Sequence, residues 1–275
     1  MNGTARRKRR IGWFWTTITA VFLLVYLFPL FWMISASFQP NVTSVNIDWI
    51  PAQPSVDGYA EILESGLGNL GVSVIVALGS ALLTLIIAIP AGYALSRLRS
   101  RTVGVALILL LLAQMIPSIV LANSFYAMFS SWGLLNTYLG LIFASTTLGV
   151  PFATILLRSF MLRLDNDVVE AATLDGLGPL GTLVRIVVPL SRNAIITAAV
   201  FTFLFSWGDL LFGLTLVTQE QMRPITVFIY ALTKSQLNTW ASVMAASLIA
   251  SIPAVIVIFT AQRYIKSGIA VGTGR

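Results

Sequence analysis

Long apolar runs separated by short charged segments dominate the chain. A spanning helix needs about 20 apolar residues, and five runs reach or approach that length, at 11–38, 69–96, 102–157, 194–217 and 235–262. The third run has 56 residues without a charge, enough for two spans, and Ser130–Gly133 suits a turn between them. We therefore predict six spans, at about 12–36, 70–96, 104–129, 138–160, 194–216 and 241–262.

Prolines interrupt most of these spans. Five of the six contain one, at Pro29, Pro90, Pro117, Pro151 and Pro253. Proline removes a helix hydrogen bond and bends the axis. Two interpretations stay open: the ordinary kinking of membrane helices, or a bundle that rocks or gates.

Composition places the chain in a membrane. Of its 275 residues, 57% are apolar and only 10% charged, whereas a soluble domain carries about 25% charged residues. The mean hydropathy is +0.89. We predict an all-α integral membrane protein made of a single transmembrane domain, 1–275. The uncharged stretch from Ile11 to Ile47 is too long for a signal-peptide core, so we expect a retained first span.

The basic residues test the orientation of the spans. With six spans and both termini on one side, fifteen of the seventeen Lys and Arg residues fall on that side, including a basic tail at 1–11. Only Arg223 and Lys234 fall on the other. The positive-inside rule makes the arginine-rich side cytoplasmic. These clusters flank spans and lack interleaved aromatic residues, so we expect contact with anionic lipid and no nucleic-acid partner.

The residue types that are missing narrow the chemistry. The chain has no Cys and no His, which excludes disulfides, thiol nucleophiles, imidazole bases and zinc sites built on Cys or His. The spans offer no acid–base pair or nucleophile arrangement, so we predict no catalytic residue, no metal site and no membrane-embedded enzyme.

One segment, the loop at about 161–192, has a pattern unlike a solvated linker. Asp167 followed by Glu170 suits a helix start, Gly176 suits its left-handed end, and Pro179 suits the first turn of a second helix. That second helix has an apolar face at helical spacing, formed by Leu180, Leu183, Val184, Val187 and Val188. Such a helical hairpin either docks into a groove of a partner protein or lies on the membrane surface.

The same loop resembles the EAA loop of bacterial ATP-binding-cassette (ABC) importer permeases. The family pattern is E-A-A, two residues, D-G, nine residues and I-x-L-P. It is matched by Glu170, Ala171, Ala172, Asp175, Gly176, Ile186 and Pro189. Val188 replaces the usual leucine, and Asn193 stands where many members have a further proline.

Other segments resemble the carbohydrate-uptake class of these permeases. They are the external segment 49–63, 91–97 at the end of the second span, 115–117, 133–140 and 205–209. In the last, Gly208 replaces the usual asparagine. A short helix at Tyr59–Glu64 is expected within the longest external segment, at about 39–68.

The resemblance implies a type I importer permease with six transmembrane helices in the cell membrane. It implies a heterodimer with a second permease, a dimer of ABC ATPase subunits below, and an extracytoplasmic solute-binding protein that delivers a sugar or polyol. ATP and Mg would bind at the partner ATPase, and this chain would bind no cofactor. Glu170–Gly176 would enter the ATPase cleft.

Lysine positions agree with this division of labour. A phosphate-binding loop needs G-x-x-x-x-G-K-[ST]. The lysines are Lys8, Lys234 and Lys266, and none follows a glycine. We therefore expect the chain to depend on a separate ATPase.

Asp209 is the one acid inside a predicted span, and an intramembrane ionisable residue is a functional candidate. It either lines the solute path or contacts the binding protein, as Trp207 and Asn123 would, or it caps a helix that starts near Leu211. Gln114, Asn136, Tyr230, Asn238 and Trp240 suit sugar binding by type, and equally suit packing and interfacial positions.

A stand-alone secondary transporter is the alternative function. It would need ionisable groups near the middle of the membrane, often within repeated halves. The spans hold only Asp209, and no internal repeat is visible.

Overall fold

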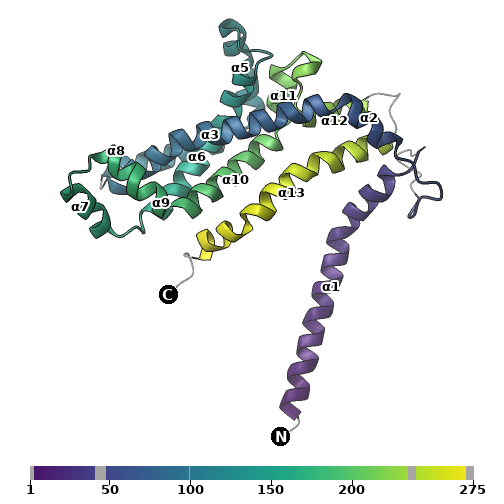
Figure 1. Ribbon diagram of the computed structural model, residues 1–275, viewed down its shortest axis with the longest axis horizontal. Helices are drawn as coiled ribbons and strands as arrows, with labels where there is room; N and C mark the ends of the chain where they lie inside the picture. The colour runs from purple at the N-terminus through teal and green to yellow at the C-terminus, as the bar shows by residue number, and fades with distance from the viewer. Residues whose placement is uncertain (1–2, 41–47, 99, 235–239, 271–275) are drawn as a thin grey trace. The chain divides into compact units, whose positions relative to one another are not determined.

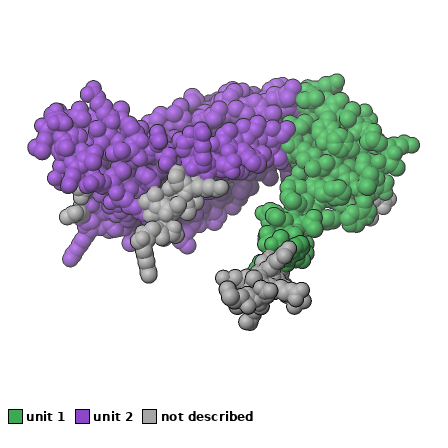
Figure 2. All heavy atoms as spheres, turned by 60° about the horizontal axis from the view of Figure 1, so that its bottom comes forward, with its two compact units in different colours: residues 1–65, 231–249 green, residues 66–230, 250–275 purple. Residues whose placement is uncertain are grey.

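The computed structural model describes residues 3–40, 48–98, 100–234 and 240–270. All regular structure within these ranges is helical, which confirms the predicted all-α class. The chain divides into two compact units, one of residues 1–65 and 231–249 and one of residues 66–230 and 250–275 (Figures 1 and 2).

The first unit holds α1 (Gly3–Ser37), α2 (Asp57–Ser65), the end of α12 (Ile225–Lys234) and the start of α13 (Trp240–Ala270). Side chains of α1 are exposed from Trp15 to Phe31, as expected of a helix whose solvent is lipid. The predicted helix at Tyr59–Glu64 is confirmed, because α2 covers it. The Tyr59 hydroxyl lies 2.7 Å from Ser37 Oγ, which ties α2 to the end of α1.

The core of the second unit is a bundle of α3 (Leu67–Arg97), α6 (Tyr138–Met161) and α10 (Arg192–Trp207) (Figure 1). The three helices meet at Gly149 of α6, whose backbone lies against a threonine side chain from each of the other two. A Cβ at Gly149 would lie 2.7 Å from Thr84 Oγ1 on α3 and 3.0 Å from Thr202 Cγ2 on α10. Small residues allow this close approach, which drives helix association where no hydrophobic effect acts.

The apolar run that begins at 102 is bent in its first half. It forms α4 (Arg101–Gln114) and α5 (Ser118–Trp132), which meet at an angle of 90°. Pro117 sits at the break, where its ring prevents a continuous helix. The turn predicted at 130–133 lies later than expected, because α5 continues through Trp132 and the turn occupies 133–137. Gly133 ends α5 with φ +69°, a conformation that favours glycine.

After Trp207 the chain continues as α11 (Leu211–Leu216), the short 3₁₀ helix η2 (Glu220–Met222) and α12. By length and composition, four described helices suffice to cross a membrane: α1, α3, α6 and α13. Two bent pairs bring the number to six if each is one span: α4 with α5, and the helical segment Pro179–Leu190 with α10. The count of six spans stays a prediction.

Candidate functional site

The predicted helical hairpin between α6 and α10 is present. It consists of α7 (Asn166–Leu174), α8 (Pro179–Thr182), the π-helical turn η1 (Leu183–Val187) and α9 (Val188–Leu190). Figure 1 shows these elements gathered at one end of the second unit. We refer to residues 161–192 as the EAA loop.

The first helix starts two residues earlier than predicted. The side chain of Asp165, rather than that of Asp167, caps it, because Asp165 Oδ1 accepts the backbone N–H of Asp167 at 3.1 Å. Two aspartates that can both cap stand close together here, and Asp165 permits the longer helix. Asp167 lies in the first turn instead, where its negative charge suits the helix dipole.

The end of α7 is the left-handed cap that the sequence predicted. Gly176 has φ +85°. The N–H of Leu177 donates to the carbonyl of Ala172 at 3.1 Å, and the N–H of Gly176 donates to that of Thr173 at 3.1 Å. These two bonds form a Schellman motif. Nothing lies within 4 Å of a Cβ at Gly176, so the residue is required by its backbone conformation and not by crowding.

The second helix of the hairpin is not one regular helix with one apolar face. Pro179 begins α8 as predicted, but a π-helical turn follows at Leu183–Val187. The extra residue in that turn rotates the later side chains around the axis. Leu183 and Val187 are buried, whereas Leu180 and Val184 are exposed. The sequence pattern grouped all four on one apolar face and did not indicate which of them the fold buries.

The buried side of the hairpin anchors it to the bundle. Leu183 and Val187 share a core cluster with Leu157 and Met161 of α6 and Ala194 of α10. The chain then bends by 82° at Ser191 into α10. Of the other motif residues, Ile186 is half-buried, and Pro189 is exposed one turn before α10.

The opposite side of the hairpin is an exposed tip. Leu174 is 88% exposed and Leu180 is 73% exposed. The motif residues Glu170, Ala171, Asp175 and Gly176 are also exposed, whereas Ala172 is buried and supports the turn. Large exposed apolar side chains beside a charged rim are typical of protein contact surfaces.

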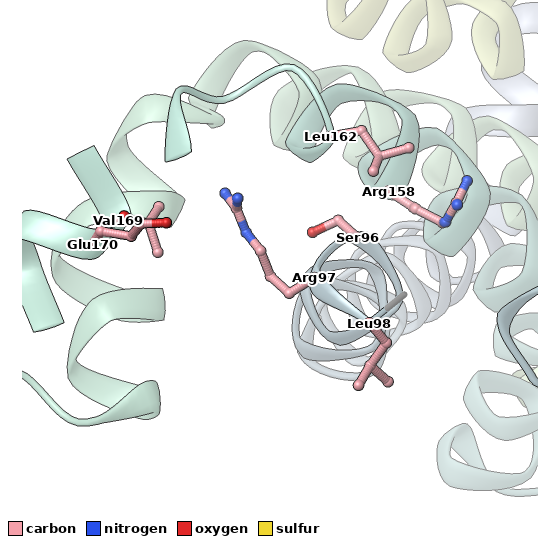
Figure 3. Close-up of a pocket in the computed structure, with 7 residues that line it drawn as sticks. All are labelled: Ser96, Arg97, Leu98, Arg158, Leu162, Val169 and Glu170. Carbon is pink, nitrogen blue, oxygen red and sulfur yellow. The ribbon is translucent and has the colours of Figure 1, made fainter. Parts of the chain in front are cut away.

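A hollow of about 450 Å³ lies beside this tip, between the ends of α3 and α6 and the start of α7. Figure 3 shows the side chain of Arg97 extending from the end of α3 toward Glu170 on α7. The other lining residues are Ser96, Leu98, Arg158, Leu162 and Val169. The sequence analysis did not single out Arg97 by itself.

The candidate path residues fall outside the EAA loop. Asp209 lies between α10 and α11, where its Oδ2 accepts the N–H of Phe212 at 3.0 Å and its carbonyl accepts the Thr226 hydroxyl at 2.7 Å. It therefore caps the first turn of α11, as one of the two interpretations expected. Trp207 is buried, and its indole N–H donates to the carbonyl of Ala250 on α13 at 3.2 Å. Asn123 is exposed on α5.

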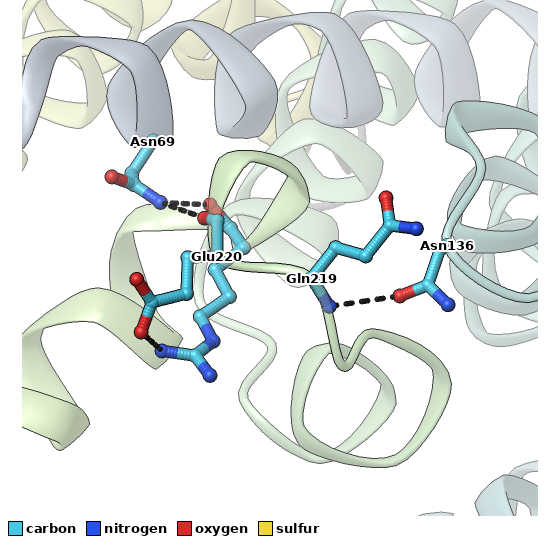
Figure 4. A network of polar contacts seen from close by, with 5 residues as sticks. Asn69, Asn136, Gln219 and Glu220 are labelled. Atoms are coloured by element: carbon cyan, nitrogen blue, oxygen red, sulfur yellow. Dashed lines mark hydrogen bonds and ion pairs between the residues drawn. The ribbon is translucent and has the colours of Figure 1, made fainter.

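Two asparagines hold the segment after α11 in place (Figure 4). Asn69 Nδ2 on α3 donates to the carbonyls of Glu220 and Arg223 at 3.2 and 2.7 Å. Asn136, in the turn before α6, accepts the N–H groups of Thr218 and Gln219 at 2.7 and 3.0 Å. Asn136, a candidate for sugar binding by residue type, therefore makes structural hydrogen bonds within the fold.

The remaining candidates by type are scattered. Gln114 and Trp240 are exposed at the ends of α4 and α13, and Tyr230 is exposed in the middle of α12. Asn238 lies outside the described residues. The candidates therefore do not form one site within the described ranges.

A family model covers most of the chain. Residues 85–271 match the binding-protein-dependent transport system inner membrane component family, a region that includes the entire EAA loop. The matched region is more than half of the sequence.

Curated relatives and solved structures agree with that match. The chain is 30% identical to the trehalose/maltose transport system permease protein MalG of Thermococcus litoralis, over 90% of this chain and 91% of the relative. It is 30% identical to the probable ABC transporter permease protein YurM of Bacillus subtilis, over 98% and 90%. The fold matches a bacterial ABC transporter involved in import of the acidic polysaccharide alginate, with TM-score 0.78 and 21% identity over 94% of this chain and 98% of that one.

Proposed function

We propose that this chain, which belongs to the family of binding-protein-dependent transport system inner membrane components, couples solute import to a separate ATPase through its EAA loop. The chain is a permease subunit of an ABC importer, a multi-pass membrane protein whose relatives include sugar permeases. Which residues perform the coupling is the proposal.

The exposed tip of the EAA loop carries this proposal. Leu174 is almost fully exposed, next to the acidic and glycine residues of the motif at Asp175 and Gly176. A hairpin that lay flat on lipid would present one continuous apolar face, whereas here Leu180 is exposed and Leu183 is buried against the bundle. The compact tip suits insertion into a protein groove. Glu170, Ala171, Ala172, Asp175 and Gly176 are its docking residues, supported from behind by Ile186 and Pro189.

The proposed partners follow from the family. They are a second permease that completes a heterodimer, an ATPase dimer on the side of the EAA loop, and an extracytoplasmic solute-binding protein. The family description itself names dependence on a binding protein. Both chain termini then lie on the cytoplasmic side, because the arginine-rich segments flank the EAA loop and the terminal spans.

The proposed solute is a sugar or a related polyol. The relative from Thermococcus litoralis is a trehalose/maltose permease, and a relative from Mycobacterium tuberculosis, 29% identical over 94% of this chain and 96% of its own length, is a trehalose permease. Trp207, Asp209 and Asn123 remain candidates for the path or for contact with the binding protein. Their side chains lie on or after α10 and on α5.

Energy supply is delegated in this proposal. The sequence lacks a glycine-rich phosphate-binding loop ending in lysine, so ATP and Mg would bind at the partner ATPase. A stand-alone secondary transporter would instead take energy from an ion gradient.

Reconstitution into liposomes tests this division. The complete importer should take up labelled solute only when ATP, the ATPase and the binding protein are present. This chain alone, inserted in the same liposomes, should give no uptake with ATP or with a proton gradient. Robust gradient-driven uptake by the chain alone would overturn the proposal.

A further inference from the structure

The C-terminal end of α1 carries a cluster of three aromatic rings. Phe28 and Trp32 lie one turn apart on the same face of α1, and Trp49 from the following segment packs on that face. The Trp49 ring meets the Trp32 ring edge-on, with centroids 5.6 Å apart, and its centroid lies 5.8 Å from that of Phe28. Tilted and edge-on pairs at such distances are favourable for aromatic rings. Trp49 is nevertheless 63% exposed, so most of its surface faces away from α1.

Two polar side chains at the end of α1 hold Trp49 in this place. The Gln39 amide pairs with the backbone of Asp48, because Nε2 donates to the Asp48 carbonyl at 2.7 Å and Oε1 accepts the Asp48 N–H at 3.0 Å. The Ser35 hydroxyl lies 3.0 Å from the carbonyl oxygens of Asp48 and Trp49. Since the backbone at both residues is bound to α1, the exposure of the indole is a property of the fold and not of a loose loop.

The polarity of this end of the chain is reversed relative to a surface in water. Ser35 and Gln39 are buried, whereas Phe28 and Trp49 are exposed and Ile50 is 78% exposed. Large apolar side chains that are held in fixed, exposed positions mark a contact surface. Because the polar groups are turned inward and the apolar groups outward, the medium that covers this surface is at least partly apolar.

A second group of tryptophans lies at the other end of the apolar stretch of α1. Trp13 and Trp15 are exposed there, and side chains are exposed from Trp15 to Phe31. Trp32 follows Trp15 by 17 residues, which in an α-helix corresponds to about 26 Å. The hydrocarbon core of a bilayer is about 30 Å thick. The two groups are therefore spaced to lie at the two membrane–water interfaces, where Trp is enriched.

We infer that residues 48–50 form an interfacial anchor, which places the side chains of Trp49 and Ile50 in the headgroup region of the outer leaflet. The exposed Asp48 suits this level, because a carboxylate would be costly within the hydrocarbon. By holding Trp49 against α1, Gln39 fixes the depth at which α1 leaves the bilayer. The inference goes beyond the proposed function and needs only that α1 spans the membrane.

A fluorescent probe at residue 50 measures the depth of this segment. The chain has no cysteine, so Ile50→Cys provides a single site for an environment-sensitive dye. Ser65→Cys, at an exposed position at the end of α2, provides the aqueous reference. Each chain is labelled before it is assembled with its partners in phosphatidylcholine vesicles, without ATP. Quenching is measured with acrylamide in the water and with phosphatidylcholine that carries a nitroxide near its headgroup.

The anchor predicts strong quenching by the nitroxide lipid at Ile50→Cys and weak quenching at Ser65→Cys. Acrylamide quenching at Ile50→Cys should be roughly a third of that at Ser65→Cys, because the interface screens the probe from water. Equal acrylamide quenching at the two positions overturns the inference. A probe at Ile50→Cys that neither quencher reaches also overturns it, since the second permease would then cover this surface.

The same assay tests the part played by Gln39. Gln39→Leu removes both hydrogen bonds to Asp48 and should raise acrylamide quenching at Ile50→Cys toward the reference value. Gln53→Leu makes the same change at an exposed glutamine of the external segment and should leave the quenching unchanged. If Gln39→Leu does not assemble, Trp49→Ala removes the indole and should have the same effect. Unchanged quenching in an assembled importer with either variant overturns the inference. Because neither ATP hydrolysis nor uptake is measured, a failure of coupling would count against the proposed function alone.

Discussion

Asn136 Oδ1 accepts the backbone N–H of Thr218 at 2.7 Å, although 82 residues separate the two in sequence. The same oxygen accepts the Thr218 hydroxyl at 3.1 Å and the N–H of Gln219 at 3.0 Å. Asn136 also has φ +56°, a left-handed conformation that Asn tolerates better than most residues. One side chain therefore fixes both its own turn and the segment that follows α11.

Replacing Asn136 should destabilise the second unit. Asn136→Ala removes three accepted hydrogen bonds and places at positive φ an alanine, which tolerates that conformation less well than asparagine. We therefore expect a loss of about 2 kcal/mol in the free energy of unfolding. Asn136→Asp keeps an acceptor oxygen and should lose less. Thermal unfolding in detergent measures both.

The exposed Asn123 provides the matched control for that experiment. Asn123→Ala should leave the unfolding midpoint unchanged, because the side chain is exposed on α5. If Asn136→Ala unfolds at the same temperature as Asn123→Ala, the hydrogen bonds between Asn136 and Thr218 do not contribute to stability.

Local signals in the sequence were sufficient for some features of the fold and not for others. Gly133, Gly176 and Pro179 each have a backbone requirement that only their residue type meets easily, and the predicted turns and helix start are found there. The hydrogen bonds that Asn136 accepts from Thr218 and Gln219 could not be predicted, because they join residues far apart in sequence. One observable hint remained, since Asn is among the few residues that adopt positive φ.

The close approach at Gly149 gives a second prediction. Gly149→Ala puts a methyl group 2.7 Å from Thr84 Oγ1, and overpacking of this kind costs about 1–3 kcal/mol. We expect a lower unfolding midpoint and a lower yield of assembled importer.

Gly104 on α4 is the matched control, because nothing lies within 4 Å of its added Cβ. Gly104→Ala should be neutral or should stabilise by at most about 1 kcal/mol through helix propensity. Equal midpoints for the two variants would contradict a tight contact of α3, α6 and α10.

Asp209 gives the third prediction, which separates its two interpretations. As the cap of α11 it needs an acceptor oxygen and not a charge, so Asp209→Asn should keep both stability and uptake. Asp209→Ala should lose about 1 kcal/mol of stability. Unfolding midpoints and solute uptake by the reconstituted importer are measured together. Loss of uptake in Asp209→Asn with an unchanged midpoint would instead assign the charge to the path or to the binding protein.

Within the EAA loop, sequence reasoning placed the elements but missed their details. The structure has Asp165 as the helix cap where the sequence predicted Asp167, because the two nearby aspartates differ only in which backbone N–H each can reach. The π-helical turn at Leu183–Val187 depends on packing against α6 and α10, which periodicity does not contain. Arg97 was not singled out because its place in the hollow beside the EAA loop arises only when the ends of α3, α6 and α7 come together in the fold.

The most direct test of the docking role is the charge substitution Leu174→Glu. Leu174 is 88% exposed, so the change should alter folding by no more than about 0.5 kcal/mol. It would, however, bury a carboxylate in the proposed contact with the ATPase. Ile50→Glu, at a 78% exposed apolar residue outside the EAA loop, controls for the added charge.

The measurement is the amount of ATPase subunit that copurifies with each variant from membranes containing the whole importer. The docking role predicts that Leu174→Glu inserts normally and loses most of the bound ATPase, while Ile50→Glu retains it. Full retention of the ATPase by correctly inserted Leu174→Glu would contradict the assignment of the EAA loop tip as the coupling site.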